Sequence, residues 1–139
     1  MPETIIRNED FMRQIKDFSG MRFGRISPTD IDCFLDFWNK LFILVELKHG
    51  EAELPLGQKL ALERLCDACE SDTRSSCLII ARHDCGKDES IDVSQAVVSD
   101  IRWERKWHSW RDKNDTVRKL IEKVLVWKET GRAASDSES

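Results

Sequence analysis

A short apolar run that ends abruptly in charged residues most constrains how this chain can fold. Residues 41–45 read Leu-Phe-Ile-Leu-Val and lead directly into Glu46-Leu47-Lys48. Such a run is typical of a central β-strand with both faces covered. In the preceding residues 31–37, apolar and mostly acidic residues alternate, which is the period of a half-exposed strand. Two neighbouring strands that end at one edge of a sheet would bring Asp32, Glu46 and Lys48 together.

These three side chains suit metal-assisted hydrolysis. Two carboxylates offer hard oxygen ligands for Mg²⁺, and an ammonium beside them can hold an attacking water. An acidic-x-Lys pattern alone says little: with 26 acidic residues in 139, about two matches are expected by chance, and two are present. The second, at 104–106, follows no apolar run and is interpreted as surface. The plain alternative is that Glu46 and Lys48 only form a solvated strand end.

The order of these motifs resembles the PD-(D/E)XK nuclease superfamily. Ser-Pro-Thr-Asp-Ile-Asp at 27–32 is followed by Phe-Ile-Leu-Val-Glu-Leu-Lys at 42–48, and then by Gln58 at the opening of a helix. The superfamily includes restriction endonucleases, Holliday-junction resolvases and virus-type replication-repair nucleases, and this chain resembles a small phage or prophage member. The resemblance covers residues 20–70. It implies an α/β fold with a restriction-endonuclease-like αβββαβ core, in which helices flank a central mixed sheet.

The resemblance also implies a site and a cofactor, Mg²⁺ or Mn²⁺. The family's Pro usually stands directly before the catalytic Asp, whereas Pro28 lies two residues before Asp30 and four before Asp32. We favour Asp32, because its separation of fourteen residues from Glu46 resembles the usual hairpin length. Gln58 would help to hold the water or a phosphate, although an exposed Gln at a good helix position is an equal alternative. The implied catalytic residues are Asp32, Glu46, Lys48 and Gln58, and the implied metal ligands are Asp32, Glu46 and the backbone carbonyl of Leu47, with Asp30 as the alternative.

Length and composition indicate one domain. With 139 residues and 40% hydrophobic content, the chain can bury one core, expected over residues 1–131. The polar residues 132–139 are expected to form a disordered acidic tail. No stretch approaches the roughly 20 apolar residues of a membrane span, and the start does not resemble a signal peptide. A cytoplasmic protein is therefore expected, in the host cytoplasm if the chain is phage-encoded, without a membrane partner.

Positive charge gathers in the last third of the chain. Residues 100–132 carry ten Lys and Arg against six Asp and Glu, although the net charge is −4. Cations and aromatics interleave there, as a surface that binds phosphates and stacks on bases requires. The alternative is that Trp103 and Trp107 enter the core while the cations solvate the other face. The predicted nucleic-acid-binding residues are Arg102, Arg105, Lys106, Trp107 and Arg111.

Hydrophobic periodicity predicts the scaffold around these motifs. The strand after the second helix should lie beside the Glu46 strand through a helical crossover. The predicted elements are a helix over 9–18, strands over 21–26 and 31–37, a turn at 38–40, the strand that ends at Glu46, a helix over 56–70, strands over 77–81 and 91–98, and a helix over 116–128.

The cysteines raise a zinc alternative. Cys66, Cys69, Cys77, His83 and Cys85 lie within twenty residues of sequence. The first two continue an apolar helix stripe and Cys77 begins a predicted core strand, so buried, reduced thiols are the simpler interpretation.

The sequence therefore predicts a divalent-metal-dependent nuclease that acts on DNA, with a homodimer as an arrangement that the sequence leaves open. The alternative is a catalytically silent module of this fold that binds nucleic acid or inhibits a host protein.

Overall fold

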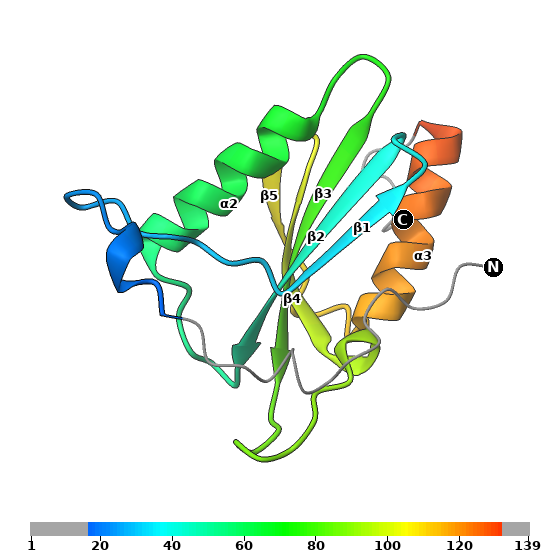
Figure 1. Cartoon of the computed structure of the whole chain (residues 1–139). Coiled ribbons are helices and arrows are strands. Elements are labelled where there is room, and N and C mark those ends of the chain that lie inside the picture. The colour runs from blue at the N-terminus through cyan, green and yellow to red at the C-terminus, as the bar shows by residue number, and fades with distance from the viewer. Residues whose placement is uncertain (1–16, 132–139) are drawn as a thin grey trace.

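A five-stranded mixed sheet forms the centre of the protein (Figure 1). The computed structural model describes residues 17–131. The strand order is β1-β2-β3-β4-β5, with β2 and β3 parallel and the other neighbours antiparallel. The elements are η1 (Ser19–Met21), β1 (Cys33–Phe37), β2 (Leu41–His49), α2 (Leu56–Cys69), β3 (Ser75–His83), η2 (Val93–Gln95), β4 (Val97–Trp103), β5 (Lys106–Ser109) and α3 (Val117–Thr130).

The two long helices cover opposite faces of this sheet (Figure 1). Strand side chains alternate between the faces, so β2 and β3 are buried on both sides. The α2 face includes Leu44 and Ile80, which pack with Leu62 and Cys66 of the helix. The larger cluster on the other face joins alternate strand residues to α3, with Leu120, Val124 and Trp127 all at most 2% exposed. The α/β class with a mixed sheet flanked by helices is therefore confirmed.

The structure contains the turn, helix and strand that the sequence predicted around the candidate site. The turn at residues 38–40 joins β1 to β2, with Trp38 and Asn39 at φ 58° and 61°. Positive φ at both central positions is the geometry of a type I′ hairpin, whose twist matches that of the flanking strands. The helix predicted over 56–70 is α2, and the strand predicted over 77–81 lies inside β3, parallel to β2. The predicted crossover is therefore confirmed.

One predicted strand is absent, and another begins later than predicted, at Val97. Residues 21–26 form no strand: Met21 ends η1, and Phe23 and Ile26 close a tight turn through an isolated bridge. Gly24, at φ +63°, makes this turn possible. Two antiparallel strands, not three, therefore precede α2 among residues 17–131. Residues 91–98 include η2, where Asp92 Oδ1 accepts a hydrogen bond from the Ser94 N–H, and the following strand is β4.

Parts of the sequence-based interpretation lie outside the described residues. Nearly all of the helix predicted over 9–18 does so, and so does the whole predicted tail over 132–139. Between residues 17 and 131, the structure contains no helix that is long and apolar enough to cross a membrane.

Candidate active site

The site lies at the end of the sheet where β1 begins, at Cys33, and where β2 extends beyond it to His49. The last residue pair of this antiparallel ladder joins Cys33 to Val45. Asp32 directly precedes β1, and its negative charge lies close enough to Glu46 to raise the pKa of that carboxyl group. The Leu47 N–H donates a hydrogen bond of 2.8 Å to Asp32 Oδ2, which ties the aspartate to the edge of β2. The two predicted acidic ligands therefore lie close together at the edge of β2.

The backbone of Leu47 also contributes to this corner. In a strand, the N–H and C=O of one residue point toward the same neighbouring strand. Because the Leu47 N–H points toward Asp32, its carbonyl faces the β1 side as well, beyond the start of β1 at Cys33. This orientation suits the predicted third oxygen ligand.

Glu46 is buried at the end of β2. Glu46 is 3% exposed. Its Oε2 accepts a 2.7 Å hydrogen bond from Gln58 Nε2 and lies 3.6 Å from Lys48 Nζ. The other oxygen, Oε1, is buried and accepts no hydrogen bond from residues 17–131. Burial, and then the negative charge of Asp32, raise the pKa of Glu46 to about 7, while Lys48 opposes the shift. The surroundings of Glu46 therefore disfavour its ionised form, and an additional positive charge nearby would stabilise that form.

Gln58 joins the helix to the strand. It lies in the first turn of α2, and its Oε1 is 3.3 Å from Lys48 Nζ while its Nε2 binds Glu46. The amide therefore contacts both charged residues of the Glu-Leu-Lys motif. Lys48 lies two residues after Glu46 and so faces the same side of β2, half-buried. Asp32 lies near Glu46, as its effect on the pKa of Glu46 shows. The structure thus brings all four predicted catalytic residues together.

The donor set suits a divalent cation with oxygen preference. Two carboxylates lie close together beside the Leu47 backbone. Glu46 Oε1 is a buried acceptor that lacks a hydrogen-bond partner among residues 17–131. Mg²⁺ commonly uses one or two carboxylates and keeps several waters. Among residues 17–131, no three or more His, Cys, Asp or Glu side chains gather as a metal-binding group, so such an ion would rely on water for the rest of its shell. Asp30 is exposed, and its charge also raises the pKa of Glu46, so it stays an alternative ligand.

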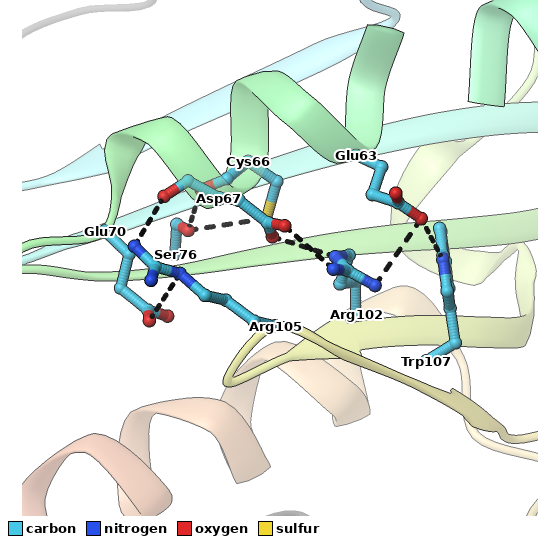
Figure 2. A network of polar contacts seen from close by, with 8 residues as sticks. All are labelled: Glu63, Cys66, Asp67, Glu70, Ser76, Arg102, Arg105 and Trp107. Atoms are coloured by element: carbon cyan, nitrogen blue, oxygen red, sulfur yellow. Dashed lines mark hydrogen bonds and ion pairs between the residues drawn. The ribbon is translucent and has the colours of Figure 1, made fainter. Parts of the chain in front are cut away.

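The predicted nucleic-acid surface is occupied by acidic groups of the same chain (Figure 2). Arg102 makes two hydrogen bonds of 2.8 Å to the carboxylate of Asp67, and Arg105 Nε lies 3.5 Å from Glu70 Oε2. Arg111 pairs with Glu51 at 2.8 Å. Three of the four predicted cations are therefore neutralised, and only Lys106 makes no ion pair with a described residue.

The tryptophans of this segment are mainly structural. Trp103 and Trp110 are buried on the α3 side, as the core alternative predicted for Trp103. Trp107 is half-buried on the other face, where its Nε1 donates a 2.6 Å hydrogen bond to Glu63 and Lys59 Nζ lies 4.9 Å from the ring centroid. An amphipathic signal for these contacts exists: Glu63, Asp67 and Glu70 recur at spacings of four and three, which places them on one face of α2.

Within residues 17–131, the cysteines do not gather with other potential ligands into a metal-binding group. All five are free, and Cys66 and Cys77 are buried in clusters on opposite faces of the sheet. Burial raises the pKa of the Cys66 thiol to about 11, so it stays protonated. The buried-thiol interpretation therefore accounts for these two residues.

Comparison of the chain with protein-family models, with curated proteins and with solved structures found no significant match. The resemblance to the PD-(D/E)XK superfamily therefore rests on the sequence motifs alone.

Proposed function

We propose that this protein is a divalent-metal-dependent nuclease that hydrolyses phosphodiester bonds in DNA. The observation that carries the proposal is the environment of Glu46: a buried carboxylate with one orphaned oxygen, next to Asp32 and in contact with Lys48 and Gln58. A Glu recruited only for stability would be paired through both oxygens, because an unpartnered buried acceptor is destabilising. Strongly shifted acids beside a cation are instead typical of functional sites.

Each residue has a role that follows from its contacts. Asp32, Glu46 and the Leu47 carbonyl would hold Mg²⁺ or Mn²⁺, which would supply a more acidic water and neutralise charge on the phosphate. Lys48 contributes a fixed positive charge that stabilises negative charge as it develops on the phosphoryl oxygens. Gln58 orients this pair, because it donates to Glu46 and accepts from Lys48.

The silent-module alternative keeps one argument of its own. The cations predicted to face phosphates are mostly bound to Asp67, Glu70 and Glu51. A surface neutralised in this way attracts nucleic acid less than the sequence indicated, which favours the inhibitor form of this alternative over the nucleic-acid-binding form. If the protein lacks catalysis, it would bind nucleic acid or inhibit a host protein. Homodimerisation stays a prediction.

A cleavage assay separates these two proposals. Purified protein is incubated with linear duplex, single-stranded, nicked and branched DNA in Mg²⁺ or Mn²⁺, and in EDTA. We expect products from at least one substrate with either metal and none in EDTA. Intact substrates in all metal-containing reactions would favour the silent module.

A further inference from the structure

An open cleft adjoins the candidate active site between the 25–30 segment and the first half of α2. Its volume is about 660 Å³, and Gln58 and Asp30 line it. Gln58 also binds Glu46, so the cleft begins where the site ends. Figure 1 shows the blue segment beside the beginning of α2, on the side of the sheet that this helix covers. A chain of phosphates leaving the site could therefore continue into this cleft.

Two arginines line the cleft from different elements. Arg25 comes from the tight turn after η1, and Arg64 comes from α2. Both are exposed, and neither makes an ion pair with any residue between 17 and 131. They differ in this from Arg102 and Arg105, which would have to leave acidic partners before they could bind a phosphate. Two arginines without an acidic partner thus lie beside the candidate site, whereas Lys106 is the only predicted nucleic-acid-binding cation of the Trp-rich segment that makes no ion pair with residues 17–131.

The position of Arg25 is fixed by its turn. Phe23 and Ile26 exchange two backbone hydrogen bonds, of 2.8 and 2.9 Å. Gly24 takes the positive φ of the first central position, as in a type II′ turn, and Arg25 occupies the second. A side chain carried by a closed turn loses less conformational entropy on binding than one on an open loop.

The charge distribution of α2 favours the same end. Its first turn contains no acidic residue, whereas Glu63 and Asp67 lie in its second half and Glu70 directly follows it, where they pair with Arg102 and Arg105. The positive end of the helix dipole is therefore not neutralised where α2 borders the cleft. This adds to the field of the two free arginines.

We propose that Arg25 and Arg64 bind backbone phosphates of the DNA strand that flank the scissile bond, an inference that rests on the proposed nuclease function. Guanidinium groups bind phosphate oxygens through paired, charge-assisted hydrogen bonds. Contacts of this kind position a strand without reading its sequence. Asp30 also lines the cleft. Its negative charge would repel a phosphate next to it unless a cation is bound there.

Binding measured in EDTA tests this inference apart from catalysis. Fluorescence anisotropy follows short fluorescein-labelled single-stranded and duplex DNA over a salt series, with the parent and the double variant Arg25→Ala/Arg64→Ala. We expect the double variant to bind about tenfold more weakly, with the slope of log K against log salt reduced by about two units. Arg118→Ala is the matched control, because Arg118 is an exposed arginine on α3, across the sheet. It should match the parent.

The outcomes distinguish the cleft from the proposed function. If the double variant Arg25→Lys/Arg64→Lys keeps the parent's slope of log K against log salt, the positive charges of the two side chains bind phosphates, as proposed. If the double Ala variant binds DNA like the parent, or if the parent binds neither DNA probe, the cleft assignment is wrong even where metal-dependent cleavage is seen. A loss of binding that depends on both arginines supports the cleft even in a protein that cleaves nothing. The same salt series is repeated with a fluorescein-labelled RNA probe, and an effect of the double variant that is confined to RNA would overturn the assignment to DNA.

Discussion

Gln58 donates a 2.7 Å hydrogen bond from Nε2 to Glu46 Oε2, across the gap between the beginning of α2 and the end of β2. This bond satisfies one oxygen of a buried carboxylate and leaves Oε1 free beside Asp32. Because Gln58 Oε1 also accepts a hydrogen bond of 3.3 Å from Lys48 Nζ, one amide fixes the relative positions of a carboxyl group and an ammonium group. The helix therefore orients the charged end of the strand.

Replacing Glu46 with Gln should stabilise the protein when metal is absent. The folded-state pKa of Glu46 is raised from 4.5 to about 7, so the folded protein holds this proton more tightly than the unfolded chain does. The stability that this provides is fully present below pH 4.5 and is lost as pH rises through about 7. The loss is on the order of 3 kcal/mol, from about 1.4 kcal/mol per pKa unit.

Urea unfolding in EDTA across this pH range measures the effect. We expect the parent to lose stability between pH 4.5 and 8 more steeply than Glu46→Gln, and the variant to be the more stable protein at pH 8. A variant less stable than the parent at pH 8 would mean that Glu46 has a structural role.

Lys48→Ala should lower turnover by about two to three orders of magnitude, the size typical of a removed charge-stabilising donor, with little change in DNA affinity. Lys40→Ala is the matched control, because Lys40 lies in the turn before β2, at its other end. Single-turnover cleavage and EDTA binding measurements separate the two effects. Equal turnover by Lys48→Ala and the parent would remove Lys48 from the catalytic set.

Arg102→Ala should destabilise the fold more than it weakens DNA binding. Its side chain is 11% exposed and bridges Asp67 and Glu63, so its removal would leave two partly buried carboxylates without their partner. The expected loss is about 1–3 kcal/mol. Arg118→Ala breaks only an exposed pair with Glu122 and should cost under about 0.5 kcal/mol. Chemical denaturation compares the two variants, and similar small losses would show that the Arg102 network contributes little.

Crystals soaked in Mn²⁺ should show anomalous density beside Asp32 and Glu46. We expect distances of about 2.0–2.3 Å to carboxylate oxygens, the range for hard divalent ions with oxygen ligands. The same soak of Glu46→Gln should lose the peak. Density next to Asp30 with none at Asp32 would select the alternative aspartate.

The sequence could predict the elements that local pattern determines. The apolar run at 41–45 and the stripe of α2 give strand and helix directly, and the Glu-Leu-Lys motif then places Glu46 and Lys48 on one face. The turn at residues 23–26 was missed, because Phe23 and Ile26 match a strand pattern while Gly24 allows the chain to reverse.

Long-range pairing could not be predicted in the same way. Arg102 and Asp67 are 35 residues apart in the sequence. They meet because β4 pairs with β3 in the sheet and the Arg102 side chain extends from the face that α2 covers. A local excess of cations therefore indicated a phosphate surface where the folded chain forms ion pairs. The free arginines of the cleft, Arg25 and Arg64, have no periodic signal that would connect them.

The most direct test of the central claim is cleavage by the parent beside the double variant Asp32→Asn/Glu46→Gln, purified in parallel and assayed on the same DNA substrates in Mg²⁺ and Mn²⁺. The variant removes both carboxylate charges with little change in shape, and it also controls for a contaminating nuclease. We predict that the parent cleaves at least one substrate in metal and that the double variant cleaves none. A parent that leaves every substrate intact, or a folded double variant that cleaves as fast as the parent, would contradict the proposed active site.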